Sequence, residues 1–357
     1  MSEQVDLLFA AMEQLGTPAF LAKDGAVIRC NGICAQLSVA AGTTLRALSD
    51  GEYPVGSAVK NLPIAAGGRQ WSATVMPTEA GDVFLLQPDD DDEAVLPYIA
   101  TAAARGLMPA VQALQSAGAE LFPAIEELEN DEFQRQTAEL TRAFFRLYRS
   151  VLLLTDFDRM RTEDDKYQRR TDVFLLLREL LTAAEDGLRD CNVRLSWTVP
   201  QGSAYGAVNA AELQRAVLSL LSNAAKFAGD SRTVTVTVKA AQKRLTVAVR
   251  NDTVMAPEAM AGAFRLYGQD KLPEDDRTGA GLGLPVAQRI ARRHGGSLVL
   301  ESSDAVGTVA TLLIRLDLPE GDIAAPTADL YGGYDPMLVE FSCILPSDTY
   351  DSRNVDL

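Results

Sequence analysis

The glycine-rich run GAGLGL at residues 279–284 constrains the fold of this chain more than any other feature. It leads directly into a predicted helix, Pro285 to Arg293, which ends at Gly295–Gly296 before a strand. Glycines let a backbone approach a phosphate closely, and a helix N-terminus offers unpaired N–H groups with a partial positive charge. Proline is tolerated in the first turn of a helix, so Pro285 fits this assignment. The order of elements therefore predicts a phosphate-binding site.

The segment 171–319 around this run mixes helices and strands. TDVFLLLRELLTAAEDGLRD predicts a helix with Asp172 near its start, and AAELQRAVLSLLSNAAKFAG predicts a second helix ending at Gly229. VRLSWTV, TVTVTVKA, RLTVAVR and GTVATLLIRLDLP alternate like strands. These patterns predict an α+β sandwich, one mixed sheet with helices on one face.

The motifs GAGLGL, RIARRHGGSLVLES and GT, in this order, resemble the second glycine box of sensor histidine kinases and their ATPase relatives. LQRAVLSLLSNAAKFA resembles the asparagine-containing helix of the same family. The resemblance implies a Bergerat-type α/β sandwich that binds ATP or ADP with Mg²⁺, and it implies that Asn223 coordinates the metal. Ser219 replaces a frequent second asparagine one turn earlier, on the same helix face. The nucleotide-binding residues implied by the match are Asn223, Lys226, Asn251, Gly279, Gly281, Leu282, Gly283, Leu284 and Thr308.

The adenine half of the site departs from the family pattern. Asn251 takes the place of an aspartate that accepts a hydrogen bond from adenine, while Thr253 and Met255 replace glycines. An asparagine can still accept, but it loses the charge-assisted part of the bond, ~1–2 kcal/mol or roughly tenfold in affinity. A shift by one residue would offer Asp252 instead, which points the other way in a continuing strand. We therefore expect nucleotide binding to be weakened.

Residues 94–165 carry apolar positions at alternating spacings of four and three, which predict two helices in an antiparallel hairpin. Each apolar stripe is too narrow to be buried by the two helices alone. Pairing with a second copy would give a dimeric four-helix bundle, and the alternative is a monomeric hairpin packed on its own domains. The seam consists of Leu107, Val111, Leu114, Gly118, Leu121, Ile125 and Leu128, and then of Phe133, Thr137, Leu140, Phe144, Leu147, Val151 and Leu154.

No phosphoacceptor histidine stands in the first of these helices. The family carries a histidine five residues before a proline, and here Ala104 precedes Pro109 at that spacing, with Arg105 in place of the usual acidic neighbour. His294 is the single histidine of the chain. Its position in the HGG turn predicts a structural role at the helix end, where a partly positive imidazole suits the dipole.

Residues 1–88 resemble a PAS sensor domain, with a strand, an Asp24–Gly25 turn, a second strand and Asn31 at the matching position. A second hairpin is expected to turn at residues 79–82, and the acidic run 89–93 is expected to be a solvated linker. The tail, 320–357, has enough apolar content to dock on the body, with no function indicated. The fold class expected is thus α+β and multidomain.

Composition restricts the partners and the location. The net charge of −16 argues against nucleic acid and anionic membranes, because both would repel the chain. The first residues have no basic segment of a secretory signal, and no apolar run reaches the ~20 residues of a membrane span, so we expect a cytoplasmic protein without membrane insertion. Scattered spacing of Cys30, Cys34, Cys191 and Cys343 favours reduced structural thiols, and the alternative is a metal or redox site at the Cys30/Cys34 pair.

Together these features predict a signal-transduction pseudokinase that acts by conformation on a partner, either a response regulator or another kinase. One alternative is an active enzyme of the same family that phosphorylates a partner in trans, with Glu212 assisting. Another is a scaffold that binds no nucleotide.

Overall fold

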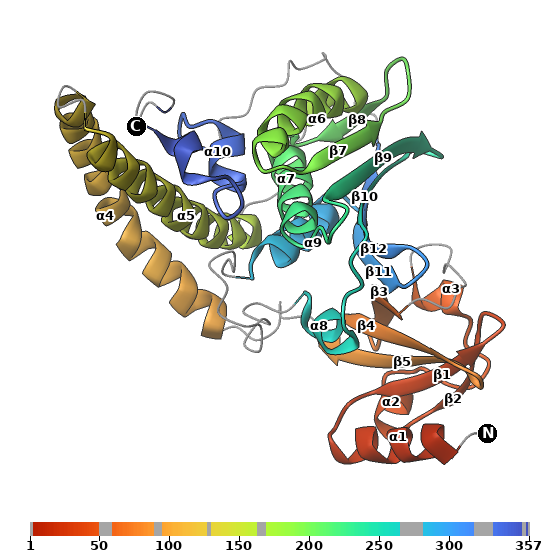
Figure 1. The fold of residues 1–357 in the computed structure, drawn as a ribbon. Coiled ribbons are helices and arrows are strands. Elements are labelled where there is room, and N and C mark those ends of the chain that lie inside the picture. The colour runs from red at the N-terminus through yellow and green to blue at the C-terminus, as the bar shows by residue number, and fades with distance from the viewer. Residues whose placement is uncertain are drawn as a thin grey trace.

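The computed structural model describes residues 3–49, 59–88, 95–126, 130–162, 169–264, 281–317, 331–351 and 355. Within them the chain is a mixed α+β protein, as predicted. One sheet has ten strands in the order β2-β1-β5-β4-β3-β11-β12-β10-β9-β7, and a second pairs β6 with β8 (Figure 1).

The N-terminal part builds the first half of the long sheet. The turn predicted at Asp24–Gly25 is confirmed, since both residues have positive φ (52° and 79°) and join β1 to β2. Asn31 caps the following helix: its Oδ1 accepts from Cys34 N at 2.9 Å and from Ala19 N at 3.0 Å. The elements are α1 (Glu3–Gln14), β1 (Ala19–Lys23), β2 (Ala26–Cys30), α2 (Gly32–Gln36), α3 (Leu45–Leu48), β3 (Val59–Ala66), β4 (Arg69–Thr78) and β5 (Gly81–Pro88).

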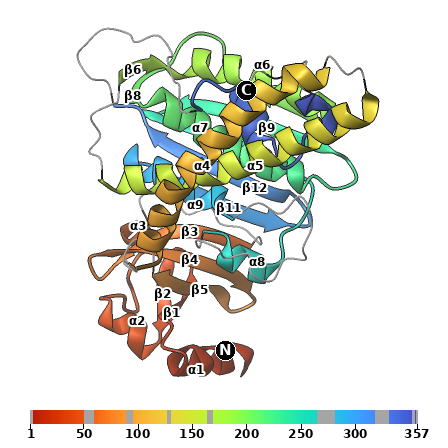
Figure 2. The ribbon, with the colours of Figure 1, turned by 90° about the vertical axis from the view of Figure 1, so that its left-hand side faces the viewer.

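Two helices of 32 residues each follow, α4 (Val95–Glu126) and α5 (Asp131–Thr162). They pack against each other, and Figure 2 shows them crossing in front of α7 and α9. Asn130 starts α5, since its Oδ1 accepts from Glu132 N at 2.9 Å. Part of the heptad seam stays exposed to solvent: Leu107, Leu114, Leu121, Phe133, Leu140 and Leu147.

The second half of the long sheet carries α6, α7 and α9 on one face, and their apolar sides share one core with the strands (Figure 1). Helix α7 ends at Lys226, three residues before the predicted Gly229, and α9 begins at Gly283, two residues before the predicted Pro285. The elements are β6 (Arg169–Asp172), α6 (Val173–Asp190), β7 (Arg194–Thr198), β8 (Tyr205–Val208), α7 (Ala210–Lys226), β9 (Thr233–Ala241), β10 (Arg244–Asn251), α8 (Pro257–Gly262), α9 (Gly283–Arg293), β11 (Ser297–Ser303) and β12 (Gly307–Arg315).

The two halves of the sheet join through β3 and β11, which the sequence did not predict. The strands are antiparallel, with Leu300 opposite Asn61 and Ser302 opposite Val59. Asn61 Nδ2 also donates to the carbonyl of Met260 in α8 at 3.1 Å. The N-terminal sheet is therefore bonded directly to the edge of the C-terminal sandwich.

The tail docks on the body. Its helix α10 (Pro336–Glu340) and the 3₁₀ turn η2 (Ser347–Tyr350) pack against α5, and α10 also contacts α6 and α7. Tyr334 lies edge-on to Phe145 and Tyr148 of α5, with ring centroids 5.1 and 5.2 Å apart. The tail thus ties the second long helix to the helical face of the sandwich.

Candidate functional site

The start of α9 provides an anion-receptive helix end. Gly281 has φ +68°, and Leu282 is buried and precedes the helix. The first intrahelical bond runs from Val286 N to Leu282 O at 3.0 Å, so the N–H groups of Gly283 and Leu284 come before it. Such N–H groups and the helix dipole favour a phosphate. The predicted Gly279 lies outside the described residues.

Asn223 and Ser219 of α7 face this helix start. A Cβ added to Gly283 would lie 3.5 Å from Asn223 Nδ2 and 3.7 Å from Ser219 Cβ. Ser219 is completely buried, and its Oγ has no hydrogen-bond partner among the described residues. The absence of a Cβ at Gly283 therefore leaves room beside two polar groups on one helix face.

This arrangement suits Mg²⁺ bound jointly with phosphates. Mg²⁺ prefers oxygen ligands and is usually held by one or two protein groups plus substrate phosphates. In the described part of the chain no cluster of three His, Cys, Asp or Glu residues could hold a metal alone. The amide oxygen of Asn223 would serve as a single protein ligand. Lys226 lies one turn further on, with its Nζ 4.6 Å from the ring centroid of Phe227.

Asn251 ends β10 on the other side of α7. It is 6% exposed, and its Nδ2 donates to Ala224 O at 3.2 Å. That bond fixes the amide, and the buried Oδ1 has no partner within the described residues. A buried acceptor without a partner costs about 1–3 kcal/mol, so Asn251 is ready to accept from a ligand N–H group.

Asp252 points away from this position, as expected for the next residue of a strand. It is exposed and its Oδ1 accepts from Gly229 N at 3.0 Å. Hydrogen bonds from Ser231 and Gly229 lower the pKa of this carboxyl below its usual value. Asp252 therefore holds the loop after α7 and does not replace Asn251.

Thr308 and Ser302 pin the loop that follows Asn251. Thr308 Oγ1 donates to Thr253 O at 2.7 Å and lies 3.0 Å from Ser302 Oγ, which accepts from Met255 N at 2.8 Å. The side chain of Met255 packs against the main core. The described contacts of Thr308 are thus with the loop beside Asn251.

His294 has the structural role that its position predicts. Its Nε2 accepts from Asn209 N at 3.0 Å, which requires an unprotonated nitrogen, so the proton is on Nδ1, 2.8 Å from Ile290 O. With these two contacts the imidazole is neutral. The ring is therefore not partly positive, contrary to the expectation from the sequence. Glu212 pairs with Arg293 at 3.3 Å and lies roughly 16 Å before Asn223 along α7, so it cannot assist there.

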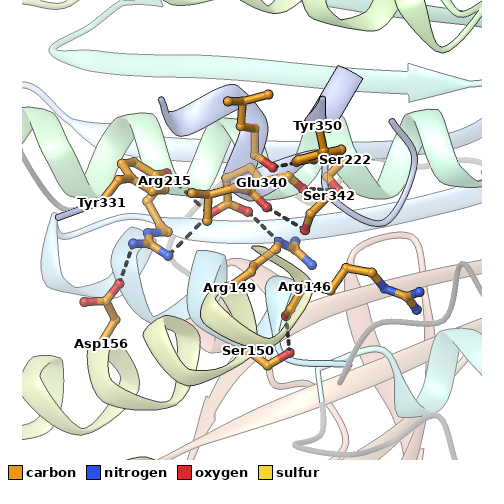
Figure 3. A network of polar contacts seen from close by, with 12 residues as sticks. Arg146, Arg149, Ser150, Asp156, Arg215, Ser222, Tyr331, Glu340, Ser342 and Tyr350 are labelled. Atoms are coloured by element: carbon orange, nitrogen blue, oxygen red, sulfur yellow. Dashed lines mark hydrogen bonds and ion pairs between the residues drawn. The ribbon is translucent and has the colours of Figure 1, made fainter. Parts of the chain in front are cut away.

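A buried ionic cluster beside the site was missed by the sequence interpretation. Glu340 of α10 accepts from Arg149 Nε at 2.8 Å and forms an ion pair with Arg215 at 3.3 Å, and Arg215 pairs with Asp156 at 3.1 Å (Figure 3). The Tyr331 hydroxyl donates to Glu340 at 3.3 Å. An acidic residue inside the apolar run LVEFSCIL was the available signal, since buried carboxylates require partners.

The charges in this cluster support one another. Burial disfavours the charged guanidinium of Arg149, but Glu340 and Cys343 together outweigh this effect, so the pKa of Arg149 is raised above its usual value. Burial, assisted by Glu340, raises the pKa of Tyr331 well above its usual range, so its hydroxyl remains a donor. The cluster therefore joins α5, α7 and α10 through paired charges.

Comparison with known proteins gives a family for this architecture. Residues 208–320 match the family described as histidine kinase-, DNA gyrase B-, and HSP90-like ATPase. Histidine protein kinase DivJ of Caulobacter vibrioides is 31% identical over 175 residues, which are 48% of this chain and 29% of that protein. Sensor histidine kinase WalK of Bacillus subtilis is 23% identical over 186 residues, 51% of this chain and 30% of that protein. The match thus spans less than a third of these relatives.

A solved structure of histidine kinase ThkA in complex with response regulator protein TrrA covers 89% of this chain and 99% of that chain, at 15% identity and a TM-score of 0.42. The fold and the site define a histidine kinase-like ATPase domain. Residues 208–320 carry it, and about half of the chain is similar to sensor histidine kinases. In the described residues no helix is long and apolar enough to cross a membrane.

Proposed function

We propose that this chain is a nucleotide-binding signalling protein that acts by conformation and does not phosphorylate a histidine of its own. The observation that carries the proposal is the pair of polar groups without partners at the two ends of the site. Ser219, whose Cβ lies beside Gly283 at the start of α9, has an Oγ with no partner in the described residues, and Asn251 Oδ1 at the end of β10 has none there either. Their placement matches a ligand with a phosphate at one end and an amino-bearing ring at the other.

The residues divide the binding between them. The N–H groups of Gly283 and Leu284 receive phosphate, Asn223 holds Mg²⁺ against it, and Asn251 accepts from the adenine amino group. Mg²⁺ would neutralise phosphate charge when bound. Thr308 acts through the loop that it holds beside Asn251.

The pseudokinase part of the proposal rests on the missing phosphoacceptor histidine in the helical pair. Position 104 in α4 is alanine, and a methyl group cannot accept a phosphoryl group. His294 is the single histidine, and it lies buried at the end of α9, where its ring nitrogens contact the backbone N of Asn209 and the backbone O of Ile290. The chain therefore offers no histidine that is both exposed and on the helical pair.

The domain division predicted at 1–88, 94–165, 171–319 and 320–357 is part of this proposal. The strand order β2-β1-β5-β4-β3 and the cap at Asn31 support a PAS-like sensor. The pairing of β3 with β11 gives the sensor a direct route to the site, because Asn61 holds α8 just after the Asn251 loop. A signal would then shift the population of two states, with an effect limited by its differential affinity for them.

A homodimer is also part of the proposal. The exposed seam residues lie on one stripe of each long helix, and Leu114 and Leu140 are 51% and 60% exposed. A second copy would cover both stripes in a four-helix bundle. The output partner would be a response regulator or another kinase, and the net charge of −16 opposes nucleic acid as a partner.

Incubation with γ-labelled ATP tests the proposal, with the chain alone and with candidate response regulators. We expect no acid-labile phosphate on this chain or on the candidate regulators. A known histidine kinase assayed in parallel should become labelled. Labelled regulator would establish the alternative of an active kinase working in trans. If the chain takes up no nucleotide at all, the scaffold alternative holds.

A further inference from the structure

The Arg149 side chain contacts the tail and also lies near the start of α9. Its Nε lies 2.8 Å from Glu340 Oε2 of α10. Its Nη2 lies 3.8 Å from the point where a Cβ of Gly283 would be. One guanidinium from α5 therefore reaches from the buried cluster to the helix end that receives phosphate.

The geometry of a guanidinium allows both contacts together. Its five N–H donors form a rigid fork, so one edge can hold a carboxylate while a terminal nitrogen points elsewhere. Figure 3 shows Arg149 directed toward Glu340 from α5. Ser219 is fully buried, its Cβ lies 3.7 Å from the same point near Gly283, and its Oγ has no hydrogen-bond partner among the described residues. A buried hydroxyl without a described partner therefore lies beside the same helix end as Arg149 Nη2, and this combination indicates a place for a ligand.

We propose that Arg149 binds the terminal phosphate of a nucleoside triphosphate held at α9, and that Glu340 of the tail is the positioning residue that fixes it there. This inference rests on the proposed function, since it adds a phosphate contact to the same site. A diphosphate lacks the third phosphate that Arg149 would bind, so the contact distinguishes triphosphate from diphosphate. Arginine suits this role because its planar donors match phosphate oxygens.

The charges around Arg149 explain why the contact would also involve the tail. Arg149 and Arg215 carry two positive charges, and Glu340 and Asp156 carry two negative charges. A bound phosphate adds negative charge beside Glu340, and both anions then share Arg149. A bound triphosphate therefore changes the ion pairing of Glu340 in the docked tail, which links α5 to α7.

Calorimetry with the full chain tests the inference, with Mg-ADP and a non-hydrolysable triphosphate, Mg-AMPPNP, as probes. The variants are Arg149→Gln, Arg149→Gln with Glu340→Gln, and the control Arg142→Gln. Arg142 lies on the same helix and donates to the tail carbonyl of Ser342 at 3.3 Å. The control removes a tail contact of the same residue type without touching the site.

We expect Arg149→Gln to weaken Mg-AMPPNP binding by roughly tenfold or more, with Mg-ADP affinity changed by less than about twofold. Arg142→Gln should leave both affinities at the wild-type values. The double variant keeps the buried cluster neutral, so it should show the same selective loss even if the single variant fails to fold.

An equal loss for both nucleotides, or no loss for Mg-AMPPNP, would overturn the role of Arg149. If the wild-type chain binds both probes and the selectivity is unchanged, only this inference fails. If the wild-type chain binds neither probe, the proposed nucleotide function fails, and the inference fails with it.

Discussion

Arg149 Nε and Glu340 Oε2 lie 2.8 Å apart, although 191 residues separate them in the sequence. Both side chains are buried, at 9% and 0% exposure. The contact joins the second long helix to the tail, and Arg215 connects the same carboxylate to α7. The tail is therefore a structural part of the body.

Replacing Glu340 by alanine should destabilise the protein strongly. The change leaves Arg149 and Arg215 in a buried site without their shared partner, which costs about 3–5 kcal/mol in the free energy of unfolding. Urea unfolding measures this loss. The control Asp335→Ala removes only the cap bond to Met337 N, 2.7 Å long, and should cost about 1 kcal/mol. Equal losses for the two variants would contradict the buried cluster.

Replacing Asn251 by aspartate should tighten Mg-ADP binding roughly tenfold, because a charged acceptor binds the adenine amino group more strongly. The same change removes the bond to Ala224 O and should lower the free energy of unfolding by about 1–3 kcal/mol. Calorimetry and urea unfolding measure the two effects.

Asp252→Asn is the matched control for Asn251→Asp. Because Asp252 bonds to Gly229 and points away from the site, its replacement should leave Mg-ADP affinity unchanged. An unchanged Mg-ADP affinity in Asn251→Asp would show that Asn251 does not contact adenine.

Replacing Leu114 by glutamate should prevent dimer formation. Leu114 is 51% exposed in the single chain, and a charge buried in a bundle core without a partner is strongly unfavourable. Sedimentation velocity should show a dimer for the wild type and a monomer for this variant. Leu7→Glu, at a 67% exposed position of α1, is the control and should remain dimeric. A wild-type monomer would establish the alternative of an unpaired hairpin.

Cys34 and Cys191 should resist alkylation in the folded protein. Burial raises the pKa of each thiol to about 12, so at roughly pH 8 almost none is the reactive thiolate. Iodoacetamide followed by peptide mass spectrometry should find both unmodified until urea is added. Rapid labelling of native Cys34 would revive the redox interpretation of the Cys30/Cys34 pair.

The parts of the site that sequence predicted are those encoded locally. The GAGLGL run, the helix carrying Asn223 and the HGG turn each lie within one short segment, and their elements occur within three residues of the expected positions. The missing negative charge at Asn251 could also be predicted, because it follows from the residue type alone.

The parts that sequence did not predict depend on contacts between distant segments. The pairing of Asn61 with Leu300 gives no local pattern, because any alternating strand could complete that edge. The structural role of Glu340 likewise depends on its ion pairs with Arg149 and Arg215, which are distant in the sequence. The proton position on His294 follows from Asn209 N, which lies 85 residues away.

Titration of the full chain with Mg-ADP tests the central claim, that this site binds nucleotide. We expect a saturable heat with a dissociation constant below about 1 mM, lost when EDTA removes Mg²⁺ and in Asn223→Ala. The fold of that variant is checked by its thermal transition. No heat at millimolar Mg-ADP, or equal binding by Asn223→Ala, would contradict the account.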